Sequence, residues 1–135
     1  HEPAPKPVAD QTTTIIRPIP FDSETRLEPY ARVAGDFPIE ERRRVTINVT
    51  VECEDCIDDS LTIYLLDEYN YRMLESDQPY DPIDSVYSKI YFYSGPMDRG
   101  HYFIVLENAS DSQEVAIKVK ANLSYIQDNL TAGSR

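Results

Sequence analysis

The two cysteines of this 135-residue chain are separated by two residues, in the sequence Cys53-Glu-Asp-Cys56. A pair with this spacing can form a redox-active dithiol, half of a zinc site or a small structural disulfide. Redox catalysis is disfavoured because neighbouring carboxylates raise the pKa of a thiol, and a zinc site needs further ligands that no other cysteine supplies. We therefore predict a disulfide between Cys53 and Cys56, with modest stabilisation because the closed loop is short.

Metal binding is a second chemistry that the sequence allows. Five carboxylates surround the cysteine pair: Glu52, Glu54, Asp55, Asp58 and Asp59. Calcium takes its oxygen ligands from flexible acidic loops, but this spacing matches no calcium loop, and a solvated acidic turn is the favoured interpretation. A free N-terminal histidine can chelate copper, and His101 would complete a brace with His1. We predict no cofactor, with calcium and copper as lesser alternatives.

Four Asn-x-Ser/Thr motifs mark acceptor sites for N-linked glycans, at Asn48, Asn108, Asn122 and Asn129. A chain this short rarely holds four by chance. The motifs therefore predict a secreted glycoprotein at the cell surface or outside the cell, a compartment in which a disulfide is also stable.

The charge of the chain limits its partners. Acidic side chains number 24 against 13 lysines and arginines, which gives a formal charge of -11. Such a chain repels phosphate backbones, so a nucleic-acid partner is disfavoured. No apolar run reaches the roughly 18 residues of a membrane span. The sequence also lacks a Gly-x-Ser-x-Gly motif and a phosphate-binding glycine loop, and we predict no catalytic residues and no enzyme activity.

Alternation of apolar and polar residues predicts an all-β fold. Val45, Ile47, Val49 and Val51 alternate with polar residues, and the segment from Val115 to Tyr125 follows the same pattern. Further strands are expected at 61–66, 86–93 and 102–107, with a short one near 30–33 and turns rich in Pro, Asp and Gly between them. The segment 66–75 could form a short helical turn, although we expect a connection there. The prediction is an antiparallel, jelly-roll-like β-sandwich of five to seven strands.

The first 29 residues hold most of the ten prolines and show no helical period. They predict an extended N-terminal arm, followed by a sandwich domain over 30–127 and a tail over 128–135. Within the arm, β-branched residues from Thr13 to Ile16 are suited to pairing along a sheet edge.

The order of these segments resembles the GOLD-like and pre-peptidase C-terminal sandwich modules of secreted and cell-surface proteins. The resemblance covers about residues 30–127. Four segments carry it: the strand Val45 to Val51, the run Leu61-Thr-Ile-Tyr-Leu-Leu-Asp67 leading into Glu68-Tyr-Asn-Tyr-Arg72, the segment Gly100-His-Tyr-Phe-Ile-Val-Leu-Glu-Asn108, and the strand Val115 to Tyr125. It implies a non-catalytic interaction module and brings no catalytic residues.

The leading functional hypothesis is self-assembly into a cell-surface filament or sheath, in which the arm completes the sheet of another copy as a donor strand. Four apolar residues would anchor the arm: Ile15, Ile16, Ile19 and Phe21. The first alternative is a monomeric extracellular accessory module that binds a protein or glycan and whose arm folds back on its own sheet. Its binding face would be the tyrosine-rich run from Tyr87 to Tyr93 with the tyrosines at 64, 69, 71 and 80, although core packing is the favoured role of those rings. Copper binding is the second alternative.

Overall fold

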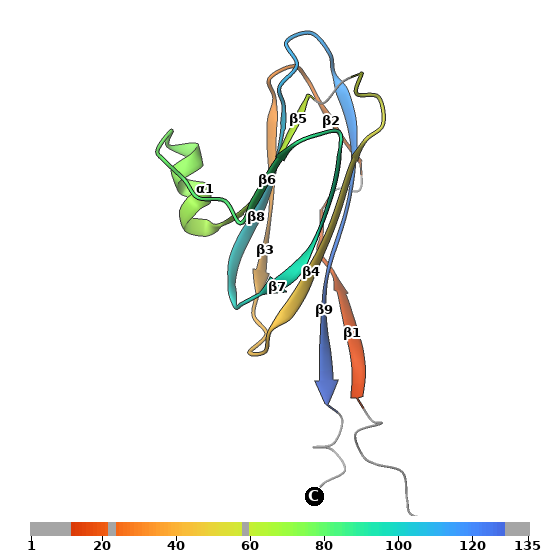
Figure 1. Ribbon diagram of the computed structural model, residues 1–135, viewed down its shortest axis with the longest axis vertical. Helices are drawn as coiled ribbons and strands as arrows, with labels where there is room; N and C mark the ends of the chain where they lie inside the picture. The colour runs from red at the N-terminus through yellow and green to blue at the C-terminus, as the bar shows by residue number, and fades with distance from the viewer. Residues whose placement is uncertain (1–11, 22–23, 58–59, 129–135) are drawn as a thin grey trace, which may run out of the picture.

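The protein is described from a computed structural model that covers residues 12–21, 24–57 and 60–128. These residues form nine strands and one helix (Figure 1). The elements are β1 (Thr12–Pro18), β2 (Glu24–Leu27), β3 (Arg32–Ile39), β4 (Val45–Cys53), β5 (Leu61–Asp67), α1 (Glu68–Glu75), β6 (Asp84–Tyr87), β7 (Ile90–Met97), β8 (Gly100–Asn108) and β9 (Val115–Asp128).

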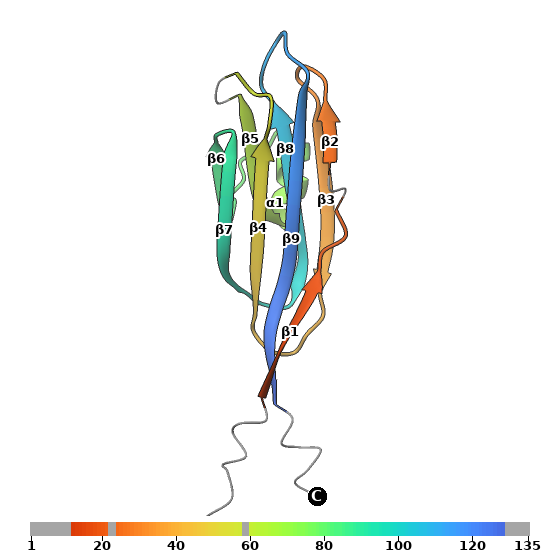
Figure 2. The same cartoon turned by 90° about the vertical axis from the view of Figure 1, so that its right-hand side faces the viewer.

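The strands form two antiparallel sheets that pack face to face (Figure 2). Sheet A has the order β1-β9-β4-β7, with β2 also paired to β9, and sheet B has the order β3-β8-β5-β6. Among β2 to β9 the strands therefore pair from the outside inwards: β2 with β9, β3 with β8, β4 with β7 and β5 with β6. This is a long antiparallel hairpin rolled into two layers, which is the jelly-roll arrangement. The predicted all-β sandwich is confirmed.

Side-chain alternation along β4 and β9 explains why these strands occupy the middle of sheet A. The odd-numbered residues of β4 are buried, and the even-numbered ones lie on the outer face. Val49 stands opposite Ala121 of β9, so both strands present their apolar side to sheet B. A period of two places alternate residues on opposite faces, and burial of one face fixes the register.

The main core lies between the sheets, and a smaller one lies on the outer side of sheet B. In the smaller cluster Leu66 of β5 and Val105 of β8 pack against Leu74 of α1. The helix begins after Asp67, whose carboxylate accepts a hydrogen bond from the backbone N–H of Asn70 at 2.8 Å. Capping of this kind satisfies a helix N–H that has no intrahelical partner. The helix therefore covers one sheet face, where the sequence led us to expect a connection.

The described part of the arm belongs to the sandwich itself. Strand β1 pairs with β9 of the same chain, from Thr12 opposite Asp128 to Pro18 opposite Asn122. Ile19 is 5% exposed and its N–H bonds the carbonyl of Ala121 at 3.0 Å. The sequence-based boundary at residue 29 thus divides sheet A, since β1 and β2 are two of its strands.

Phe21 also packs against the core, with its ring directly over Gly35 of β3. A Cβ atom at position 35 would collide with that ring, so a larger residue there would force the Phe21 ring to move.

Two strand predictions need correction. The single strand expected over 86–93 is two strands, β6 and β7, which turn at Ser88 and Lys89 and belong to different sheets. The short strand expected near 30–33 is the longer β3, paired with β8 along its whole length. No helix among the described residues is long and apolar enough to span a bilayer.

Candidate binding surface at the loop pole

Four connections meet at one end of the sandwich, which we call the loop pole: residues 28–31, 54–57 with Ser60, 88–89 and 109–114. It lies at the end opposite Thr12 and Asp128, the first and last described residues (Figures 1 and 2). Backbone hydrogen bonds join the connections: Cys53 N–H to Lys89 carbonyl at 2.8 Å, Asn108 N–H to Ala31 carbonyl at 2.9 Å and Ala109 N–H to Ser60 carbonyl at 2.7 Å. The loops therefore form one bonded unit.

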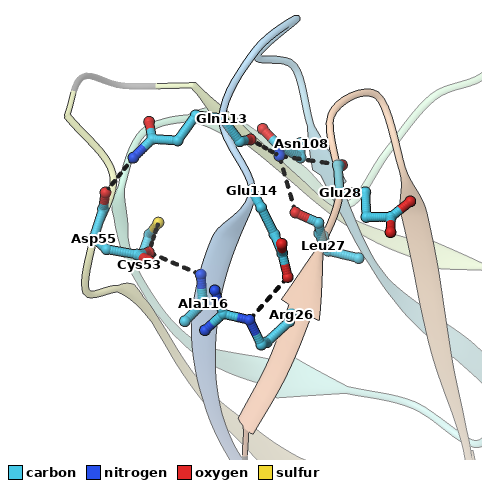
Figure 3. Close-up of polar contacts among 9 residues, drawn as sticks. All are labelled: Arg26, Leu27, Glu28, Cys53, Asp55, Asn108, Gln113, Glu114 and Ala116. Atoms are coloured by element: carbon cyan, nitrogen blue, oxygen red, sulfur yellow. Dashed lines mark hydrogen bonds and ion pairs between the residues drawn. The ribbon is translucent and has the colours of Figure 1, made fainter.

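Asn108, at the end of β8, is the centre of this unit and is fully buried (Figure 3). Its side-chain Nδ2 donates to the carbonyls of Leu27, Glu28 and Gln113 at 3.1, 3.2 and 2.7 Å. Its Oδ1 accepts from the backbone N–H of Ser110 at 3.0 Å. A buried amide with both ends bonded fixes the loops that it joins, because each broken bond would leave a buried polar group unpaired.

Asp55 ties the cysteine turn to the same network. Its Oδ1 accepts from the N–H of Ala116 at 2.8 Å, and its carbonyl accepts from Nε2 of Gln113 at 2.6 Å. The disulfide between Cys53 and Cys56 is present, which confirms that prediction. The turn after β4 is thus closed by a covalent bond. Figure 3 shows its contacts with Gln113 and with Ala116 of β9.

Tyr30 is displayed at this pole in an unusual conformation. The N–H of Ala31 bonds the carbonyl of Glu28 at 3.0 Å, which defines a turn with Pro29 second and Tyr30 third. Tyr30 has a φ of 63° and is 70% exposed. A positive φ at the third position is the pattern of a type II turn, where glycine is preferred because a side chain costs about 1 kcal/mol or more.

Other apolar side chains are exposed on the connections at this end of the sandwich. Ile57 follows the disulfide and is 82% exposed, and Tyr87 and Ile90 flank the turn between β6 and β7. Glu28 and Asp111 add acidic groups to the same end. The loop pole therefore combines fixed loops, exposed apolar side chains and negative charge.

The four predicted glycan acceptors have different surroundings. Asn48 and Asn122 lie on the outer face of sheet A, directly opposite each other, with Nδ2 of Asn48 donating to Oδ1 of Asn122 at 3.1 Å. Both are half-buried, and glycosylation at these two positions stays a prediction. The prediction of a glycan at Asn108 is wrong for the folded chain. The buried Nδ2 of Asn108 donates to three carbonyls, which leaves no room there for a glycan. Asn129 lies outside the described residues.

Among the candidate metal ligands of the acidic turn, Glu54 and Asp55 bond other residues and Glu52 is exposed. Glu54 forms an ion pair with Lys118 at 2.8 Å. Within 12–21, 24–57 and 60–128, no three His, Cys, Asp or Glu side chains form a group suited to a metal. Asp58, Asp59 and His1 lie outside the described residues, so neither the acidic turn nor the copper brace is seen in full.

His101 is held between two carboxylates on the outer face of sheet B. Its Nε2 lies 2.7 Å from Oδ2 of Asp36, and its Nδ1 lies 2.8 Å from Oε2 of Glu68. These hydrogen bonds, first that to Asp36 and then that to Glu68, raise the pKa of His101 above its ordinary value. An imidazole that donates from both nitrogens is protonated, so this arrangement suits a structural ion pair between β3, β8 and α1.

The tyrosines do not form one binding platform. Tyr91 is buried in the main core, and burial together with a hydrogen bond to Asp84 raises its pKa. Tyr71 stacks on Phe103 beneath α1, with ring centroids 3.9 Å apart. Tyr64 is half-buried beside Tyr80, and burial raises its pKa to about 12. The rings are therefore spread over several faces.

Sequence reasoning missed two features that the sequence contains. Glu28-Pro29 is a turn signal that could have drawn attention to Tyr30. The run Arg42-Arg43-Arg44 is a signal for a basic surface in an otherwise acidic chain. No protein-family model and no curated protein matches this sequence.

Proposed function

We propose that this chain is a monomeric, non-catalytic, extracellular binding module that contacts a protein partner through its loop pole. The observation that carries the proposal is Tyr30, an exposed aromatic at a turn position where glycine would fold at lower cost. Residues kept in costly conformations, and aromatic side chains displayed on fixed loops, are common at binding sites.

The partner's chemistry follows from the surface of the pole. Tyr30 and Ile57 are large and exposed, and the surrounding acidic groups favour a partner with a basic rim. The Asn108 network and the disulfide limit the entropy that the loops lose on binding.

The pairing of β1 with β9 of the same chain supports a monomeric state. To donate β1 to another copy, the chain would have to break seven register pairs with β9 and withdraw Ile19 from the core. Self-assembly is the second candidate function, and it is favoured by the edge position of β1 in sheet A together with Ile16, which is 65% exposed.

Light scattering with electron microscopy separates the two candidates. The binding-module proposal expects the intact chain to keep its monomer mass of 15.5 kDa across a wide concentration range. A version lacking residues 1–21 should lose stability because it lacks Ile19. Regular polymers of the intact chain, absent from the truncated chain, would instead support assembly through the arm.

The loop pole itself is tested by cross-linking mass spectrometry with extracellular protein from the source tissue or culture. Wild type is compared with Tyr30→Gly, which should stay folded and lose the partner. The matched control is Phe92→Ser, which removes an exposed ring from the outer face of sheet A and should keep the partner. Cross-links that persist in Tyr30→Gly, or that map to sheet B, would contradict the proposed surface.

Extracellular location is tested by glycan mapping after expression in a secretory host. We expect glycans at Asn48 or Asn122 and none at Asn108. Secreted protein that carries no glycan at either outer-face acceptor would contradict the glycoprotein part of the proposal.

A further inference from the structure

Five arginines gather at the end of the sandwich opposite the loop pole, and we call this surface the arginine pole. It comprises Arg17, Arg42, Arg43, Arg44 and Arg99. They come from β1, the connection between β3 and β4, and the turn between β7 and β8. In a chain with 13 basic and 24 acidic side chains, this is a local reversal of charge.

The acidic side chains at this end do not neutralise the arginines. Arg17 binds Glu41 through two hydrogen bonds of 3.2 Å, and this partner holds the pKa of Glu41 below its usual value. Asp98 is 3.8 Å from Arg44. Besides these pairs, the described residues at this end include two further acidic residues, Glu40 and Asp128, the last residue of β9.

The remaining arginines are in excess. Arg42 and Arg99 are exposed, while Arg43 stacks over Tyr125 with its Cζ 5.4 Å from the ring centroid and donates to the carbonyl of Ile126 at 3.1 Å. Its aromatic and carbonyl contacts hold Arg43 in place without cancelling its charge.

The acidic residues of the loop pole are too distant to cancel this charge at physiological salt. Strand β4 separates the two poles, and its nine residues span roughly 30 Å. Charges are screened over about 8 Å at that ionic strength. An anion therefore meets positive potential at the arginine pole and repulsion over most of the remaining surface.

Two hollows adjoin at this pole and share Arg43 and Arg44. One also includes Arg42 and Arg99, together with Glu41 and Asp98, the carboxylates paired with Arg17 and Arg44. The other is lined by hydroxyl side chains and a tyrosine: Thr14, Thr46, Ser124 and Tyr125. Guanidinium groups bind sulfate or carboxylate in bidentate geometry, and hydroxyls beside an aromatic ring suit the hydroxyl groups of a sugar.

We propose that the arginine pole binds an anionic polysaccharide, whose sulfate or carboxylate groups pair with Arg42, Arg43 and Arg99 while its sugar hydroxyls meet Thr46 and Ser124. The site lies at the opposite end from the loop pole, so it goes beyond the proposed function and can fail without affecting it.

The experiment is calorimetric titration of the intact chain, prepared with its disulfide and without N-linked glycans. The probes are a heparin oligosaccharide for sulfate, an oligogalacturonate for carboxylate and polyglutamate as an anion without sugar. The proposal expects at least one saccharide to bind more tightly than polyglutamate, with an affinity that falls as salt is added.

Variants locate the site. Arg42→Ala with Arg99→Ala should weaken saccharide binding about tenfold, the combined effect expected for two exposed charge contacts. The matched control, Arg72→Ala with Lys120→Ala, makes the same change in net charge away from the pole and should alter binding less than about twofold. Thr46→Val should weaken saccharide but not polyglutamate, and it leaves both outer-face glycan acceptor motifs intact.

Three results would overturn the proposal. They are no saccharide binding at low salt, an equal loss in the control variant, and polyglutamate binding at least as tight as the tighter-binding saccharide. The last would assign the pole to acidic protein segments instead.

Discussion

Replacement of Asn108 by alanine should cost the protein about 3 kcal/mol of unfolding free energy. The amide has two N–H groups for its three carbonyl acceptors and one oxygen that accepts from Ser110, so three hydrogen bonds are effectively lost. At about 1 kcal/mol each, this loss is a large fraction of the roughly 5 to 15 kcal/mol that stabilises a domain. Urea unfolding at equilibrium measures it as a lower midpoint with unchanged slope.

Asn108→Asp sharpens this prediction, because a carboxylate would face three carbonyl oxygens and should cost more than alanine. The matched control is Asn122→Ala, which removes another glycan-acceptor asparagine that is half-buried and bonded to Asn48. We expect it to cost less than about 1 kcal/mol. Equal costs for Asn108→Ala and Asn122→Ala would refute the argument that Asn108 holds the loop pole together.

Three further predictions concern the arm, the disulfide and His101. Ile19→Asp should lower the free energy of unfolding in urea by more than about 3 kcal/mol because it buries a charge. Ile16→Asp, at an exposed position, should change it by less than about 0.5 kcal/mol. Similar costs for the two variants would contradict the packing of the arm. Replacing Cys53 and Cys56 by serine should lower the free energy of unfolding by at most about 2 kcal/mol, the closure entropy of a four-residue loop. A complete loss of folding would show that the disulfide stabilises the fold by more than loop closure accounts for. The pKa of His101 is raised in the folded state, so the stabilisation from its ion pair is complete below the unfolded pKa of about 6.5 and is lost as pH rises through the folded pKa. The Tm of wild type should therefore fall relative to that of His101→Gln as pH is raised from about 6 to about 8.5. Parallel curves of Tm against pH would exclude the ion pair.

The alternating pattern of β4 and β9 was sufficient to predict the sandwich, because burial of one face leaves little choice of register. The same rule failed for residues 86–93, where Ser88 and Lys89 turn the chain from one sheet to the other. An apolar, tyrosine-rich run does not reveal such a turn, since its composition is uniform on both sides.

The candidate site was less accessible to sequence reasoning. The Cys53–Cys56 disulfide follows from spacing and was predicted correctly. Asn108 was assigned to a glycan because its motif is local, whereas its burial depends on carbonyls about 80 residues away, at Leu27 and Glu28. The conformational free energy that Tyr30 costs depends on its backbone φ angle, which only the folded turn defines.

The most direct test of the account is a cysteine pair placed across β1 and β9. Ile16 and Ser124 are register partners, and facing residues of antiparallel strands lie within the distance that a disulfide spans. If the arm belongs to its own sheet, Ile16→Cys with Ser124→Cys should oxidise within one chain and migrate as a monomer on a non-reducing gel, while Ile16→Cys alone should give no such internal cross-link. A ladder of covalent oligomers from the double variant would contradict the account and support donation of the arm between copies.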